Sequence, residues 1–128
     1  MNQEKPFKVN SQLLPEGFPR EFDAHIYFEE SSFPQAEEFH RKAHEFFKDS
    51  KVFVGELIPK AIGPHPLPMF EINFPQEVFT EVVLWLMKER GDLSVLVHQL
   101  TGDDLYDHTQ AALWLGTPVP LKYSVFKK

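Results

Sequence analysis

The sequence of 128 residues contains no cysteine. This absence excludes disulfide bonds, thiolate nucleophiles and the Cys-ligated zinc and iron–sulfur sites. A metal ion in this protein must therefore be bound by His, Asp or Glu side chains.

Positive charge is also scarce, because 13 Lys and Arg stand against 19 Asp and Glu and give a formal net charge of −6. Such a chain repels phosphate backbones and anionic lipids, and its basic residues are scattered, so we expect no nucleic-acid or membrane-surface partner. The sequence has no apolar run of the roughly 20 residues that span a bilayer. Its first residues lack the pattern of a signal peptide. We therefore expect a cytoplasmic protein.

Apolar residues are plentiful, at 42% of the chain with 13 Phe, which is typical of a folded globular protein. The length fits one domain, so we predict a single domain over residues 1–128. Residues 1–20 are rich in proline, and we expect them to form an extended N-terminal arm. Residues 101–128 are expected to form a C-terminal extension.

The spacing of apolar residues predicts four strands and two helices. The predicted strands cover 22–28, 51–59, 69–74 and 92–100, and the predicted helices run from 31 to about 48 and from 75 to 91. Ser31 and Ser32 are suited to cap the first helix, and Pro75 to open the second. The apolar stripes predicted to face the core include Phe46 in the first helix and Met87 in the second.

This order of elements, β-α-β-β-α-β, predicts a ferredoxin-like α+β fold. Two helices would cover one face of an antiparallel sheet with the strand order 4-1-3-2. Beyond the fourth strand, we predict a short helix from about 103 to 113. The final segment is expected either to add a strand or to cover the sheet.

Polar residues on three neighbouring strands then fall on the sheet face opposite the helices. His25, Glu71 and His98 would lie side by side there, on strands about 4.8 Å apart. His65, on the loop before the third strand, can reach the same place. Two or three histidines with a carboxylate are typical ligands of non-heme Fe(II) and catalytic zinc. The sequence therefore predicts a metal site, although a single strand histidine is more often a surface residue.

Two further histidines lie four residues apart on the first predicted helix. His40 and His44 have a spacing that can bind zinc. Their neighbours Glu37 and Arg41 are charged, which favours a solvated helix face without a ligand.

Three sequence blocks resemble the DOPA 4,5-dioxygenase family. They are DAHIYF at 23–28, GPHPLPMFEINF at 63–74 and WLMKERGDLSVLVHQLTGDDLYDHTQAALWLG at 85–116. The resemblance runs from about residue 22 to 116. It implies a ferredoxin-like domain, often a homodimer, that uses non-heme Fe(II) and O₂ to open a catechol ring beside its hydroxyls.

The resemblance also implies a ligand set. The recurring histidines of the family include those that match His25, His65 and His98, which we expect to bind the metal. We expect Fe(II), with zinc or another divalent ion able to occupy the site in a purified sample. Some members carry a second histidine two residues before the one matching His25, whereas this chain has Asp23, which leaves the ligand set open.

Other residues of the matching blocks are candidates for catalysis and substrate binding. His108 matches a fourth recurring histidine and is our candidate acid–base group, with capping of the short helix or packing against the C-terminal tail as the alternative role. Glu71 or Asp23 is expected to orient a ligand. Tyr27 and Asn73, predicted on the same sheet face, are candidates for substrate contact.

The sequence thus predicts an extradiol dioxygenase that cleaves a catechol with O₂ at a His-ligated non-heme metal. Two alternatives stay open. One is a different His-ligated metalloenzyme on the same fold, because histidine sites accept several metals. The other is a non-catalytic module that binds a small ligand, because a fold does not fix a function.

Overall fold

The computed structural model describes residues 20–126, so the predicted N-terminal arm lies outside the described residues except for Arg20. The strands are β1 (Glu21–Tyr27), β2 (Phe53–Val54), β3 (Met69–Pro75), β4 (Val95–Gln99) and β5 (Leu113–Leu115). The α-helices are α1 (Phe33–Phe46), α2 (Phe79–Glu89) and α3 (Asp104–His108), and short 3-10 helices are η2 (Glu30–Ser32), η3 (Gln76–Val78) and η4 (Tyr123–Phe126).

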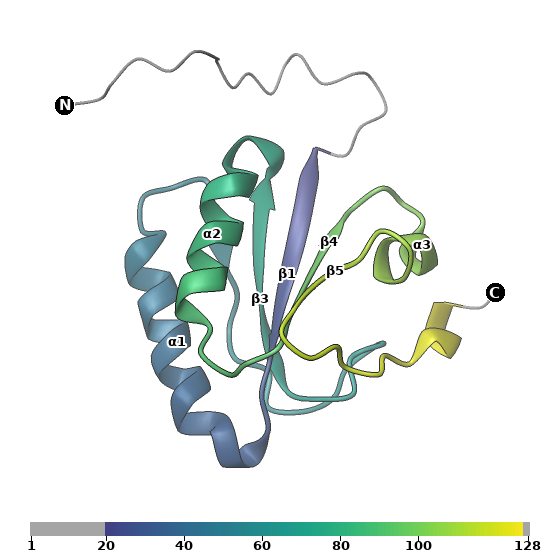
Figure 1. Cartoon of the computed structure of the whole chain (residues 1–128), viewed down its shortest axis with the longest axis horizontal. Helices are drawn as coiled ribbons and strands as arrows, with labels where there is room; N and C mark the ends of the chain where they lie inside the picture. Colours follow the sequence, from purple (N-terminus) through teal and green to yellow (C-terminus); the bar gives the residue numbers. More distant parts are fainter. Residues whose placement is uncertain (1–19, 127–128) are drawn as a thin grey trace.

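The strands form one antiparallel sheet in the order β2-β3-β1-β4-β5. This arrangement confirms the predicted ferredoxin-like α+β fold and its strand order. The additional strand β5 pairs with the outer edge of β4. Helices α1 and α2 lie on one side of the sheet, whereas α3 and the C-terminal segment lie on the other (Figure 1).

The main core lies between the sheet and the two long helices. Alternate residues of each strand face the helices because side chains along a strand point to opposite faces. Phe39 of α1 stacks on Trp85 of α2 with ring centroids 5.0 Å apart. The fully buried members of this core are Ala24, Ile26, Ala36, Ala43, Phe70, Ile72, Phe74, Val82, Leu86 and Val95. Each large apolar side chain among them contributes about 1.5–3 kcal/mol to the free energy of unfolding, because folding removes it from water.

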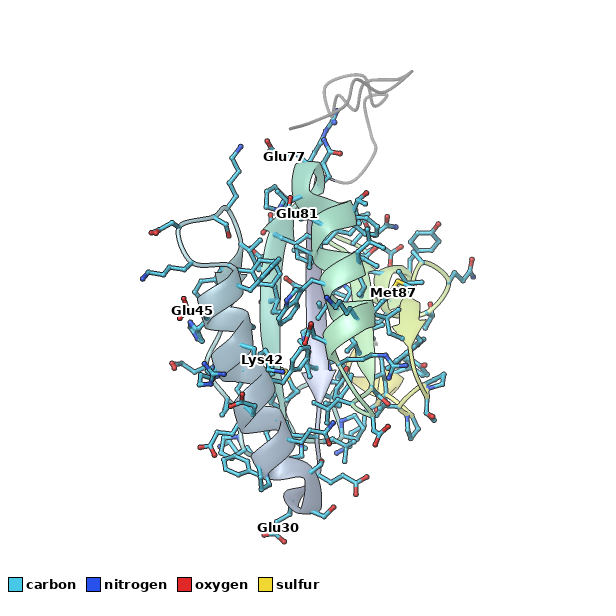
Figure 2. All side chains as sticks on the ribbon, turned by 60° about the vertical axis from the view of Figure 1, so that its left-hand side comes forward. Glu30, Lys42, Glu45, Glu77, Glu81 and Met87 are labelled. Carbon is cyan, nitrogen blue, oxygen red and sulfur yellow. The ribbon has the colours of Figure 1, made fainter. Side chains whose placement is uncertain are left out.

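Two helix residues predicted to face the core are at the surface instead. Phe46 is 54% exposed and Met87 is 56% exposed. The inward position four residues after Ala43 belongs to Phe47, which directly follows α1. Phe46 therefore points outward, and its ring stacks on that of Trp85 with centroids 5.4 Å apart. Figure 2 shows Met87 at the surface of α2.

The predicted strand over 51–59 is broken. Val54 lies opposite Ile72, and Ile58 lies opposite Met69. Four residue steps from Val54 to Ile58 thus lie opposite three residue steps of β3, from Ile72 back to Met69. The extra residue interrupts the pairing of the two strands, as a β-bulge does.

The helix ends also differ from the prediction. Ser32 occupies the position before α1, but its hydroxyl accepts a hydrogen bond from the backbone N–H of Glu29 rather than capping α1. Pro75 ends β3, and α2 begins only after η3. The helix predicted over 103–113 ends at His108, because the chain must turn there to bring β5 alongside β4.

The sheet face opposite the long helices is covered, not open. Val119 and Leu121 of the C-terminal segment pack there against Tyr27, Met69 and Leu96. The backbone N–H of residue 122 donates to the carbonyl of residue 64 at 2.8 Å, which ties this segment to the loop before β3. The predicted site therefore lies inside the protein. In the part of the chain that the structure describes, no helix is both long and apolar enough to cross a membrane.

Candidate metal centre

Four histidines from four separate segments meet under the C-terminal segment. His25 is on β1, His98 on β4, His65 on the loop before β3 and His108 at the end of α3. All four are buried, with exposed fractions of 2–7%. The rings of His25 and His65 lie 4.2 Å apart, and those of His98 and His108 lie 4.1 Å apart. The structure therefore brings together every histidine that the resemblance singled out.

Strand register explains the placement of the two strand histidines. His25 lies opposite Glu71 on β3, and His98 lies opposite Asp23 on β1. Because side chains two residues apart share a face, Asp23 and His25 point to the same side of the sheet as His98 and Glu71. The expected neighbourhood of His25, Glu71 and His98 is thus present, and Asp23 joins it.

Backbone carbonyls fix the rings of His98 and His108. Nδ1 of His98 donates to the carbonyl of Gln99 at 2.9 Å, and Nδ1 of His108 donates to the carbonyl of Asp104 at 2.7 Å. A carbonyl can only accept, so the neutral form of each ring has its proton on Nδ1 and a lone pair on Nε2. Both histidines therefore offer Nε2 as a metal ligand or a base.

His65 is held by its loop and by a phenol. The backbones of His65 and Ile62 exchange two hydrogen bonds around a turn, in which Gly63 adopts a φ of 57° that favours glycine. Nδ1 of His65 lies 2.7 Å from the hydroxyl of Tyr27, which is 2% exposed. The contact with Tyr27 orients the ring of His65 through Nδ1 and does not involve Nε2.

His25 occupies the middle of the cluster. Its Nε2 lies 3.0 Å from Nε2 of His98, and its buried Nδ1 has no hydrogen-bond partner among the described residues. Two nitrogens that each lie about 2.1 Å from one ion at a right angle are roughly 3 Å apart. The spacing of these two nitrogens therefore fits adjacent ligands of a single metal ion.

Two overlapping groups of side chains have their ligand atoms within 4.8 Å of one another. One is His25, His65 and His108, and the other is Asp23, His25 and His98. Imidazole nitrogen and carboxylate oxygen suit divalent transition metals. The buried histidine groups can hold a metal ion, and their donor set fits one.

Burial sets the charge of the cluster. It lowers the pKa of His25 well below its usual value, and the neighbouring His65, His98 and His108 lower it further. Burial, followed by His108 and His98, lowers the pKa of His65 to about 4. At neutral pH both rings are therefore uncharged, which is the form that binds metals.

Carboxylates line one edge of the cluster. Burial, together with the charge and hydrogen bond of Asp23 and the charge of Glu21, raises the pKa of Glu71 to about 7. The side-chain amide of Asn73 donates to Asp23 Oδ1 and to Glu21 Oε2, both at 2.8 Å. Asn73, expected to contact the substrate, thus binds and orients Asp23.

Asp107 is a residue whose importance the sequence did not reveal. It is 1% exposed and accepts hydrogen bonds from the backbone N–H and the hydroxyl of Thr101, at 2.9 and 2.7 Å. These bonds join the end of β4 to α3 and so hold His108 beside His98. In the sequence, only the presence of a threonine and an aspartate six residues apart could have indicated this contact.

The helix histidines lie away from this cluster. His44 is exposed, as expected. His40 is half-buried: its Nε2 donates to the carbonyl of Gly55 at 2.8 Å, and its ring meets the edge of Phe70. The prediction of a solvated face therefore holds for His44 alone.

Known proteins resemble this chain in sequence and in structure. An uncharacterised 21.2 kDa protein of Botryotinia fuckeliana is 34% identical over 135 residues, covering 97% of this chain and 73% of that protein. The DOPA 4,5-dioxygenase of Amanita muscaria is 45% identical over 60 residues, covering 47% of this chain and 26% of that enzyme. The crystal structure of a candidate dioxygenase from Nostoc punctiforme superposes with a TM-score of 0.76 at 36% identity, covering 84% of this chain and 90% of that one.

The family model agrees with these relatives. The model of the Dopa 4,5-dioxygenase family matches residues 22–125, which include all four clustered histidines. The family and the structural neighbour point to a dioxygenase enzyme. The chain belongs to the Dopa 4,5-dioxygenase family.

Proposed function

We propose that this protein is an extradiol dioxygenase that opens a catechol ring beside its hydroxyls at a His-ligated non-heme Fe(II). The observation that carries the proposal is the meeting of four buried histidines from four segments, in a family with a curated DOPA 4,5-dioxygenase member. In this reaction a ring C–C bond breaks and both atoms of O₂ enter the product, so no further reductant is needed.

The resemblance implies His25, His65 and His98 as the ligands, but the proposed reaction requires only that this histidine cluster holds the iron, whichever of its residues bind it. Fe(II) held by this cluster would supply the redox chemistry through which O₂ reacts with a catechol ring. Zinc or another divalent ion can take the same ligands in a purified sample.

The protein supplies burial and proton transfer. The C-terminal segment shields the histidines from water, and Phe126 packs on His108 with ring centroids 4.8 Å apart. His108 is our candidate to accept a catechol proton at Nε2 and to return it later, because its Nδ1 is held by the carbonyl of Asp104. Glu71 is proposed to orient the site from its edge, through its hydrogen bond with Asp23.

Three wider expectations belong to this proposal. We infer one domain over residues 1–128, a homodimer, and a cytoplasmic location. The proposed partners are a catechol-type small molecule and O₂.

The test is oxygen uptake by protein loaded with Fe(II) without air and then given a panel of catechols in aerated buffer. We expect O₂ loss in a one-to-one ratio with a ring-opened product that absorbs visible light. His25→Ala should abolish both signals, whereas His44→Ala, a matched change at an exposed histidine, should leave them intact.

Two results would overturn the proposal. Bound iron without O₂ uptake on any catechol would favour another metalloenzyme. Catechol binding without ring opening would favour a small-ligand binding module.

A further inference from the structure

The cluster contains two possible three-residue ligand sets that share His25. The set of His25, His65 and His108 consists of imidazoles alone, whereas the other includes Asp23 and His98. We propose that the metal ion is bound by Asp23, His25 and His98, and that His65 and His108 are left to face the substrate. This inference rests on the proposed function for the role of the metal.

The distances within this set are short. Nε2 of His25 and Nε2 of His98 are 3.0 Å apart, and Nε2 of His98 lies 4.0 Å from Oδ2 of Asp23. Adjacent ligand atoms of one ion lie roughly 3 Å apart, so small rotations of the Asp23 side chain complete the set. Two histidines and one carboxylate form the facial ligand set typical of non-heme Fe(II) oxygenases.

Neighbouring groups leave the right atoms of this set free. The amide of Asn73 binds Oδ1 of Asp23, whereas Oδ2 is the oxygen that lies 4.0 Å from Nε2 of His98. The carbonyl of Gln99 occupies Nδ1 of His98, which leaves Nε2. Such outer hydrogen bonds orient ligands and are a general feature of protein metal sites.

Charge favours the set with the carboxylate. A divalent cation held only by neutral imidazoles in a buried site has no counter-charge, and an uncompensated buried charge is costly. Asp23 is 9% exposed and supplies a negative charge directly beside His98. Glu71 lies next to Asp23, at the edge of the same set.

The remaining two histidines then flank the ligands. The ring of His65 lies 4.2 Å from that of His25, and the ring of His108 lies 4.1 Å from that of His98. Their Nδ1 atoms are held by Tyr27 and by the carbonyl of Asp104, so each can turn Nε2 toward a bound molecule.

The experiment measures metal content and affinity in the absence of catechol. Fe(II) or Co(II) is titrated into the metal-free 128-residue protein, into Asp23→Ala and Asp23→Asn, and into His65→Ala and His108→Ala. We expect at least a tenfold loss of affinity in both Asp23 variants and a less than twofold change in His65→Ala and His108→Ala. Asp23→Glu should restore binding, and the Co(II) absorption spectrum should change in Asp23→Asn.

Retention of metal by Asp23→Ala, or its loss from His65→Ala, would overturn the inference. Circular dichroism of the metal-free variants separates ligand loss from unfolding, and Asn in place of Asp keeps the shape of the side chain. Asp92→Asn, at an exposed aspartate, is the matched control for loss of a carboxyl, and it should bind metal normally. Because no substrate is present, failure here leaves the proposed function untouched, whereas the oxygen-uptake assay tests that function alone.

Discussion

The hydroxyl of Tyr27 lies 2.7 Å from Nδ1 of His65. Tyr27 is 2% exposed, and its ring stacks on Trp114 with centroids 6.0 Å apart. The residue that we expected to touch the substrate is therefore placed to orient a histidine. Contact between Tyr27 and a substrate stays a prediction.

Tyr27→Phe removes only the hydroxyl and keeps the stacked ring. We expect turnover to fall by about 10- to 100-fold, the usual cost of losing an outer partner of an active-site histidine, with metal content unchanged. Oxygen uptake and metal analysis measure the two effects. Tyr106→Phe, a change at an exposed tyrosine, is the matched control. Full activity of Tyr27→Phe would show that the hydrogen bond does not position His65 for the reaction.

Asp107→Ala should destabilise the protein. The change removes a buried carboxylate that accepts two hydrogen bonds, from the N–H and the hydroxyl of Thr101, and this loss costs about 1–3 kcal/mol in the free energy of unfolding. Urea unfolding of the metal-free protein measures this loss. Asp104→Ala keeps the carbonyl that holds His108 and removes an exposed side chain, so it should change stability by less than about 0.5 kcal/mol. Equal stability of the two variants would contradict the role given to Asp107.

The metal-free protein should lose stability in mild acid. The pKa of His65 is about 4 in the folded protein and 6.5 as the ordinary value, so between these pH values the unfolded chain binds more protons. Stability therefore falls as pH drops from about 6.5 toward 4. His25 has a lowered pKa and acts in the same direction. Unfolding midpoints across this range, compared with those of His65→Gln, measure the effect. A pH-independent difference between the two proteins would rule it out.

Glu71 should act in the opposite direction. Its pKa is about 7 in the folded protein against an ordinary 4.5, so the folded state holds a proton that the unfolded chain releases. This contribution to stability is complete below 4.5 and is lost as pH rises toward 7. Glu71→Gln removes the titration, so the metal-free variant should gain stability relative to the parent between pH 5 and pH 8. Glu77→Gln, at an exposed carboxylate, should show no such gain.

Local periodicity predicted most of the fold. Alternation along β1 and β3 separated Ala24 and Ile72, which face the helices, from His25 and Glu71, which face the other way. That signal depends on each residue and its nearest neighbours, so it can be read without the tertiary structure. The periodicity predicted the wrong side of the helix for Phe46, because packing between residues far apart in the chain buries Phe47 instead.

The sequence by itself determined the order of the elements, the strand order and the histidines that meet on one face of the sheet, because side-chain period and connection order restrict the possible topologies. Only the tertiary structure decided which nitrogen of His65, His98 and His108 faces the cluster. The hydroxyl of Tyr27 and the carbonyls of Gln99 and Asp104 bind the Nδ1 atoms of these three rings. The tertiary structure also brought Asp23 beside His98 and placed the C-terminal segment over the cluster. These features depend on rotamers and loop closures between residues far apart in the chain, which no local pattern specifies.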